Sequence, residues 1–386
     1  MNDVIVIGVG AMGSSACMHL AQRGARVLGL ERHAIPHDMG SSHGHSRMIR
    51  LVYSEHPDYV PLLRRAYELW HALEEATGRS LLRVTGGIYM GPPEGEFIAG
   101  ARRAAQAHWL DHELIDRAEL GRRFPQFRVP ESFAGFWEPS AGYLIPEAVI
   151  AAQAEAALRA GAVLHAHESA LDWAPDGAGY RVRTTRGVYT AGRLVFCGGA
   201  WAGKLVADLG VGVVATRQVL GWVWPRRPDL FEAGRLPVWA IDAPQLDPPG
   251  LYYGFPMAGE VPGFKVARHA PGRAVDPDVV DRKDVALADE AEVRAVLRSC
   301  IPDADGPLLA LRTCLYENSP DAHFIIDRHP AHPGVTVACG FSGHGFKFAS
   351  VVGEVLADLA LEGRTRHPIG FLGLGRFGKP AAGERA

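Results

Sequence analysis

The chain has 386 residues, and its 40 basic and 43 acidic side chains give a formal net charge of −3. This near balance provides no basic surplus for nucleic acid or for an anionic membrane surface. Five scattered cysteines form neither a disulfide framework nor a paired metal motif, and no apolar run reaches membrane-spanning length. The first expected strand begins near residue 4, which leaves no room for a signal peptide, so we expect a cytoplasmic protein.

The first 31 residues predict a dinucleotide-binding βαβ unit. Residues 4–7 are apolar throughout, as in a strand buried on both faces, and residues 11–23 have the pattern of a helix. The turn between them carries three glycines at GxGxxG spacing: Gly8, Gly10 and Gly13. Because composition alone predicts about 0.6 such matches by chance, the flanking elements carry the argument. A second strand over residues 26–30 ends at Glu31, which suits the free ribose of FAD or NAD and would repel the 2′-phosphate of NADP.

A polar loop over residues 37–46 follows this unit and leads into Arg47. Its three histidines, His37, His43 and His45, raise the alternative of a metal site, but no cysteine or carboxylate stands at ligand spacing. We therefore expect no metal. The small residues of this loop have spare N–H groups, and we interpret the loop as wrapped on the cofactor.

The rest of the chain predicts a mixture of helices and strands. Helices are expected over residues 57–77, 146–159, 290–297 and 347–362. Strands are expected over residues 82–90, 133–144, 180–184, 194–197, 216–224, 251–255 and 335–338. The first turn of the last helix would direct its free N–H groups and partial positive charge toward the loop before it. These groups favour an electron-rich ligand in that loop.

Six segments, taken together and in chain order, resemble one family. They read GVGAMG at 8–13, SSHGHSRMIR at 41–50, LYYGFP at 251–256, GFKVARH at 263–269, RTCLYENSPDAHFIID at 312–327 and GFSGHGFKFAS at 340–350. Over residues 4–377 the chain is similar to the monomeric sarcosine oxidase and N-methyltryptophan oxidase family. These enzymes are flavin-dependent amine oxidases related to D-amino-acid oxidase.

The resemblance implies an α/β fold, α+β overall, of two domains. A Rossmann-like FAD-binding domain would take residues 1–85, 145–215 and 311–386, and an antiparallel-sheet substrate-binding domain residues 86–144 and 216–310. The implied activity is hydride transfer from an N-methyl or other secondary amino acid to the flavin. O2 would be reduced to H2O2, and the imine would hydrolyse to aldehyde and amine. The implied protein is a monomer whose partners are a small amino acid and O2.

The resemblance also implies roles for the residues next to the flavin. Cys314 would bond to the flavin ring, although a lone cysteine is by default a small buried core residue. Arg47 and Lys265 would lie against opposite faces of the ring, with Lys265 activating oxygen; its alternative is an exposed strand residue. His269 is either a proton-handling group or a structural hydrogen-bonding residue.

Two cations would bind the substrate carboxylate: Arg50 with a planar two-pronged grip and Lys347 as a point charge. Their alternative is ordinary solvated surface charge. Tyr253 and Tyr316 would close the pocket around the amine. The implied cofactor contacts are Gly8, Gly10, Ala11, Met12, Gly13, Glu31, Arg32, Ser42, His43, Arg47, Met48, Ala170, Cys197, Gly198, Gly199, Trp201, Cys314, Tyr316, Phe341, Gly343, His344, Gly345, Phe346 and Lys347.

Two segments depart from the sarcosine enzyme and leave the substrate open. Residues 239–247 match poorly and carry extra acids, and residues 317–321 read more like N-methyltryptophan oxidase. An acid that reaches the pocket would select a basic or larger side chain. Three alternatives remain: a nicotinamide-dependent dehydrogenase, a flavin dehydrogenase that passes electrons to a carrier, and a non-catalytic dinucleotide sensor.

Overall fold

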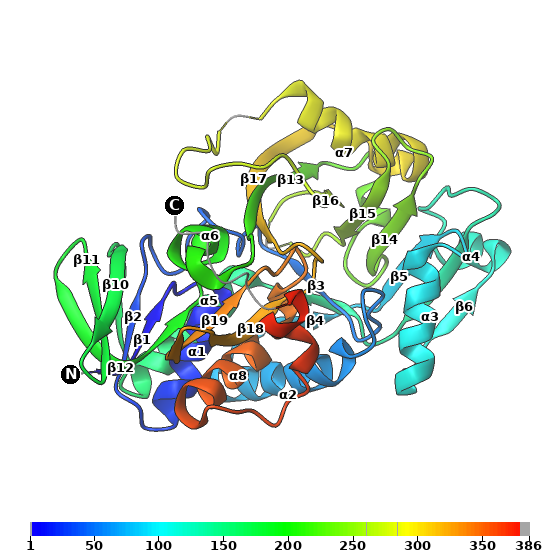
Figure 1. Cartoon of the computed structure of the whole chain (residues 1–386). Coiled ribbons are helices and arrows are strands. Elements are labelled where there is room, and N and C mark those ends of the chain that lie inside the picture. The colour runs from blue at the N-terminus through cyan, green and yellow to red at the C-terminus, as the bar shows by residue number, and fades with distance from the viewer. Residues whose placement is uncertain (1, 260, 284, 379–386) are drawn as a thin grey trace.

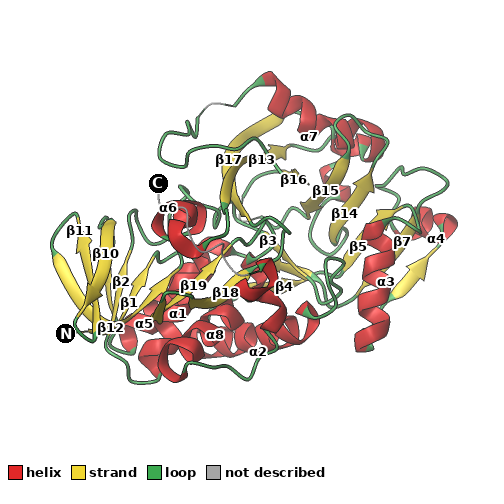
Figure 2. Cartoon of the chain, viewed as in Figure 1, coloured by secondary structure: helices red, strands yellow, loops and turns green. Residues whose placement is uncertain are grey.

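A computed structural model describes residues 2–259, 261–283 and 285–378, which form three sheets and eight α-helices (Figure 1). The first sheet and its helices occupy one side of the molecule, and the second sheet occupies the other (Figures 1 and 2). None of the helices among these residues is long and apolar enough to cross a membrane. The α/β fold expected from the sequence is confirmed, while the domain boundaries stay a prediction.

The first sheet has a parallel centre with antiparallel edges. Its parallel strands are β9 (Val163–His165), β2 (Val27–Leu30), β1 (Asn2–Ile7), β12 (Val188–Phe196) and β19 (His332–Cys339), in that spatial order. The antiparallel edge strands are β10 (Ala170–Asp176), β11 (Gly179–Thr184) and β18 (Ile325–His329). Because both faces of a parallel sheet are covered, its strands are apolar throughout, as the sequence of β1 indicates.

Four helices pack together on one face of this sheet (Figure 1). They are α1 (Ala11–Gln22), α2 (Tyr59–Thr77), α5 (Pro146–Arg159) and α8 (Ala349–Glu362). Proline at the first position of α5 fits there because the first N–H groups of a helix have no partner within it. The last helix differs from its expected start: residues 346–348 form a tight 3₁₀ turn before α8 begins.

The second sheet is mostly antiparallel. Its order is β17 (Leu308–Asn318), β13 (Val214–Val223), β16 (Phe264–His269), β15 (Gly250–Phe255), β14 (Val238–Ala243), β5 (Gly87–Gly91), β7 (Ala134–Glu138) and β6 (Glu113–Ile115). Helix α7 (Leu287–Cys300) packs on one face, and α3 (Glu96–His108) and α4 (Arg117–Arg123) lie near β5 to β7. The other face looks toward the first sheet and its helices.

Two strands expected from the sequence are each divided in the structure. The predicted strand 82–90 splits into β4 (Leu82–Val84) and β5, and 133–144 splits into β7 and β8 (Gly142–Leu144). β4 and β8 join β3 (Arg47–Ile49) in a small third sheet. The first split lies at Gly86, whose φ is +70° and whose position leaves no room for a side chain beside Trp137. Alternation of apolar residues gives no sign of such a break.

The glycine turn after β1 is shaped by a close backbone approach. A Cβ atom at Gly13 would lie 1.8 Å from the carbonyl oxygen of Gly8, whereas a Cβ at Gly10 would have no heavy atom within 4 Å. Glycine at position 13 therefore lets α1 approach the end of β1. Glycine at position 10 has no such steric requirement within the protein.

We expect Gly13→Ala to lower the free energy of unfolding by about 2 kcal/mol or more, because the overlap with the Gly8 carbonyl outweighs the better helix propensity of alanine. The matched control, Gly10→Ala, should change it by no more than about 1 kcal/mol. Urea unfolding of the FAD-free chain, followed by circular dichroism, makes the comparison. Equal destabilisation by the two substitutions would contradict the prediction.

Candidate functional site

A cavity of about 600 Å³ lies at the carboxyl ends of the parallel strands, beside the start of α1. The residues expected to contact the cofactor that line it are Gly8, Gly10, Ala11, Met12, Glu31, Arg32, Ser42, Arg47, Ala170, Cys197, Gly198, Gly199, Trp201, Tyr316, Phe341, Gly343, Gly345 and Phe346. Gly13, His43, Met48, Cys314, His344 and Lys347 do not line this cavity. Open α/β sheets bind ligands at this edge.

The acidic end of β2 holds the glycine turn in place. One oxygen of Glu31 accepts the Val9 N–H at 2.8 Å, and the other accepts the His33 N–H at 2.9 Å. The carboxylate is buried but borders the cavity, as the predicted ribose contact requires. The free N–H groups at the start of α1 lie at the same border and favour an anion such as a pyrophosphate.

Several enclosed polar atoms around the cavity have no hydrogen-bond partner in the part of the chain that the structure describes. They are Nε2 of His33, Oγ of Ser41 and both ring nitrogens of His43. Burial, together with the nearby Arg47 and Lys265 charges, lowers the pKa of His43, so its imidazole is neutral. Unsatisfied buried donors and acceptors are costly, and a ligand with many hydroxyl and phosphate oxygens would pair them. The residues present therefore fit a dinucleotide such as FAD.

The pleat of the second sheet decides which side chains face this region. On β16, Phe264 and Val266 pack in the core under α7, so Lys265, Ala267 and His269 point to the opposite face. Cys314 packs with Ala267 on that same face. Tyr253 pairs in register with Ala267 and also contacts this group.

Lys265 is 4 % exposed, and backbone oxygens hold its ammonium group. Nζ donates to the carbonyl oxygens of Gly44 at 2.7 Å and Ser46 at 2.8 Å, and it lies over the rings of Trp222 and Phe255. Burial and the nearby Arg47 charge lower the pKa of Lys265 well below its usual value. This lysine is not the exposed strand residue that its apolar neighbours would otherwise suggest.

Arg47 joins the polar loop to Cys314. Its guanidinium donates to the carbonyl oxygens of Ser46 at 2.9 Å and Ser41 at 2.7 Å, and Nη2 lies 3.5 Å from Sγ of Cys314. The four other cysteines are buried as well, and burial raises the thiol pKa of each. Contact with a guanidinium group distinguishes Cys314 from these four cysteines.

A second group of cations lies around Tyr53. Arg50 is 5 % exposed, donates to the Val52 carbonyl at 2.7 Å and pairs with Glu55 at 3.0 Å. Lys347 donates to the His344 carbonyl at 2.8 Å, and both cations lie over the Tyr53 ring. Burial and the Arg50 charge lower the pKa of Lys347 to about 7, against the attraction of Glu55.

Two histidines complete this group. Nδ1 of His269 and the Tyr316 hydroxyl share a hydrogen bond at 3.2 Å, and the rings of His269 and His344 are 6.4 Å apart. His344 also bonds to the Tyr53 hydroxyl. Burial lowers the pKa of His269 to about 4 and that of His344 to about 3, so both are neutral at neutral pH.

The sequence analysis did not single out Glu55 or Tyr53 as site residues. Burial alone would raise the pKa of Glu55, but Arg50, His344 and Lys347 lower it below its usual range. The sequence feature that could have indicated these two residues is the spacing, since Glu55 follows Arg50 by five residues and Tyr53 lies between them. In the divergent segment 317–321, Glu317 lines the cavity, and Asp321 pairs with Arg376 at 2.8 Å.

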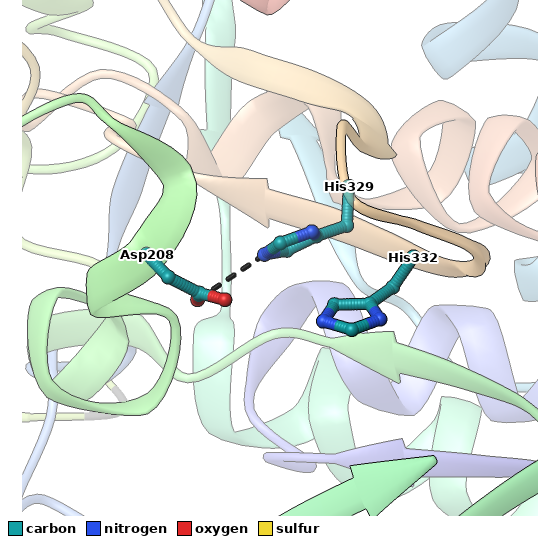
Figure 3. Close-up of side chains that lie close together, drawn as sticks. All are labelled: Asp208, His329 and His332. Carbon is teal, nitrogen blue, oxygen red and sulfur yellow. Dashed lines mark ion pairs between the residues drawn. The ribbon is translucent and has the colours of Figure 1, made fainter. Parts of the chain in front are cut away.

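The described residues contain one group of three side chains with metal-ligand spacing, Asp208, His329 and His332 (Figure 3). Nδ1 of His329 accepts the Ala331 N–H at 3.2 Å. Its Nε2 atom lies 3.1 Å from Oδ1 of Asp208. The arrangement is that of a histidine facing a carboxylate.

Comparison with known proteins agrees with the fold and the cavity. The family model for FAD dependent oxidoreductases matches residues 3–359. The chain is 47% identical to monomeric sarcosine oxidase from Streptomyces avermitilis, over 96% of each chain. It is 34% identical to N-methyl-L-tryptophan oxidase from Salmonella dublin, over 93% of this chain and 94% of that one.

Among solved structures, the open form of NikD, an amino acid oxidase essential for nikkomycin biosynthesis, superposes with a TM-score of 0.84 at 27% identity, over 96% of this chain and 97% of NikD. Glycine oxidase from Geobacillus kaustophilus superposes with a TM-score of 0.81 at 22% identity, over 97% of this chain and 98% of that one, which supports the fold. The family model covers most of this chain, and relatives at 34% identity or more cover nearly all of it. The chain therefore belongs to the FAD dependent oxidoreductase family.

Proposed function

We propose that the protein is an FAD-dependent amine oxidase that acts on an N-methyl or other secondary amino acid. The observation that carries the proposal is the pair of buried cations, Arg50 and Lys347, which both lie over the Tyr53 ring and whose charges act on His269. The similarity to monomeric sarcosine oxidase supports the same activity. FAD, when bound, takes a hydride from the carbon next to the amine nitrogen and passes two electrons to O2, which yields H2O2. The imine is hydrolysed to aldehyde and amine.

In this proposal Arg50 and Lys347 bind the substrate carboxylate. Glu55 already pairs with Arg50 at 3.0 Å, so an incoming carboxylate takes its place on the guanidinium. Tyr253 and Tyr316 enclose the amine, and the neutral His269 holds the Tyr316 hydroxyl. No acidic general base is needed, because a neutral amine can give up hydride directly. The pocket contributes orientation and exclusion of water.

The cofactor would extend from Glu31, at the adenosine end, past the glycine turn to the loop at 340–345. Arg47 and the loop before the last helix would hold its ring, and Lys265 would activate oxygen. A buried ammonium held by carbonyl oxygens stabilises negative charge that develops on oxygen. We also propose a monomer, as the names of the relatives suggest. A cytoplasmic location stays a prediction.

The general test is an assay of peroxide with a panel of N-methyl and cyclic amino acids, under air and under anaerobic conditions. We expect bleaching of the visible flavin spectrum without oxygen and stoichiometric peroxide with it. A flavin that every secondary amine leaves oxidised would contradict the proposed activity and favour a dinucleotide sensor. Bleaching without peroxide would favour a dehydrogenase.

We expect the flavin to remain with the polypeptide after acid precipitation, through a bond to Cys314. The Cys314 sulfur lies 3.5 Å from Nη2 of Arg47, and Arg47 lines the cavity. Cys314→Ser should give a colourless pellet with free FAD in the supernatant. The control Cys339→Ser, which removes a buried thiol without a guanidinium partner among the described residues, should stay yellow. A yellow Cys314→Ser pellet would rule out this attachment.

Lys265→Met should slow reoxidation of the reduced enzyme by O2 about 10²-fold or more, because the fixed charge beside the reacting oxygen is lost. Anaerobic reduction by substrate should change much less. The control is Lys283→Met, which removes an exposed lysine that does not line the cavity. Stopped-flow absorbance separates the two half-reactions, and equal slowing of both would argue against a role in oxygen activation.

Affinity for a carboxylate ligand should fall as the pH rises above about 7. Lys347 is charged below its pKa of about 7 and becomes neutral above it, while a bound carboxylate favours the charged form. The decrease is at most about ten-fold per pH unit. Propionate, which has no amine to titrate, isolates this effect when its binding is followed by the flavin spectrum.

Lys347→Gln should bind propionate more weakly at pH 6 and show little change between pH 6 and 8. The pairing of Arg50 with Glu55 involves groups whose charge is constant over this range, so it adds no slope of its own. An unchanged slope in Lys347→Gln would show that another group titrates.

A further inference from the structure

Glu317 is a buried acid beside the cofactor cavity that the proposed reaction does not use. It follows Tyr316 on β17, where successive side chains point to opposite faces. Leu315 packs with Ala200 and Ala215, on the side opposite to Cys314. Glu317 is on the Leu315 side, is 5 % exposed and lines the cavity together with Cys197 and Phe341.

The carboxyl group of Glu317 has few partners that offset the free-energy cost of its burial. Its Oε2 atom is enclosed and has no hydrogen-bond partner, and no ion pair to it forms among residues 2–259, 261–283 and 285–378. The groups around it are the thiols of Cys197 and Cys339 and the backbone of Gly340 and Phe341. The main chain is fixed, because the Glu317 carbonyl accepts the Ser342 N–H at 2.7 Å.

This environment keeps the acid protonated near neutral pH. Burial raises the pKa of Glu317 to about 8, although the backbone N–H groups of Phe341 and Gly340 act in the opposite direction. A protonated carboxyl group has one O–H donor in addition to its acceptor oxygens. An enclosed donor without a partner costs free energy that a ligand oxygen would recover.

The position of Glu317 indicates which part of the ligand would meet it. Cys197 lies against the glycine turn, where its carbonyl oxygen leaves no room for a side chain at Gly8, and Phe341 belongs to the loop before the last helix. If a cofactor extends from the glycine turn to that loop, the part of it next to Glu317 would be the segment between its pyrophosphate and its ring. That segment carries ribityl hydroxyl and phosphate oxygens, and the phosphates would repel an ionised carboxylate.

We propose that Glu317 is a cofactor-positioning residue whose protonated carboxyl group donates a hydrogen bond to the ribityl–phosphate segment of FAD. The proposal rests on the proposed function only in taking FAD as the cofactor. It requires no oxidation of an amine. When Glu317 loses its proton, the donor is lost and a buried negative charge appears beside the phosphates, so FAD is held more weakly.

The test uses the full-length chain with Cys314→Ser, so that FAD binds reversibly whether or not the wild-type bond forms. The FAD dissociation constant is measured by quenching of flavin fluorescence at pH 7 and pH 9. Affinity should fall by up to about ten-fold, because pH 9 lies one unit above the pKa of the free site. Adding Glu317→Gln, which keeps an N–H donor and does not ionise, should remove most of this pH dependence.

Two further variants sharpen the comparison. Glu317→Leu, which has no donor, should bind FAD about three- to ten-fold more weakly at pH 7 than Glu317→Gln does. Glu354→Gln changes a buried glutamate that pairs with Arg65 and His367 outside the cavity, so it should keep the pH dependence of the parent.

The same pH dependence in the parent and in Glu317→Gln would overturn the proposal, and so would undiminished FAD binding by Glu317→Leu. Both outcomes leave the amine oxidase function standing, because that function is judged by turnover. A protein that oxidises no secondary amine but shows the expected FAD binding would overturn the function and support the role of Glu317.

Discussion

The site is organised around largely buried positive charge that backbone groups rather than acids hold, Arg50 excepted. Among the described residues, Arg47, Lys265 and Lys347 are held by backbone carbonyl oxygens, and Arg50 alone of these cations pairs with a carboxylate, that of Glu55. Carbonyl dipoles only partly replace the water lost on burial, so the region favours a ligand that brings or develops negative charge. A carboxylate substrate and a cofactor that receives electrons both meet this condition.

The sequence predicts the nucleotide-binding half of the fold well because that half depends on local rules. A buried parallel strand, a close glycine turn and a helix ended by polar residues each leave a pattern within about 30 residues, as residues 4–31 show. The break at Gly86 escaped prediction, because it is linked to a contact with a distant segment. Trp137, which occupies the space beside Gly86, is far away in sequence.

The site residues were predicted from the resemblance to a family, whereas the groups they contact are known only from the structure. No rule of spacing connects Lys265 with Gly44 or Cys314 with Arg47, since these contacts join segments more than 200 residues apart. The acids of the divergent segments show the same limit. Glu317 and Tyr316 are neighbours in sequence and both line the cavity, yet the pleat places Glu317 near Cys197 and Tyr316 against His269.

The polar loop at 37–46 couples the two sides of the molecule. Glu147, on α5, accepts the Gly44 N–H at 2.7 Å, and Lys265, on the second sheet, donates to the Gly44 carbonyl at 2.7 Å. The loop is therefore held by contacts from both sides, and Arg47, directly after it, reaches Cys314. Neither side alone presents Ser41, Ser42 and Arg47 in this arrangement. The groups proposed to hold the cofactor and those proposed to activate oxygen thus depend on the same loop and on both sheets.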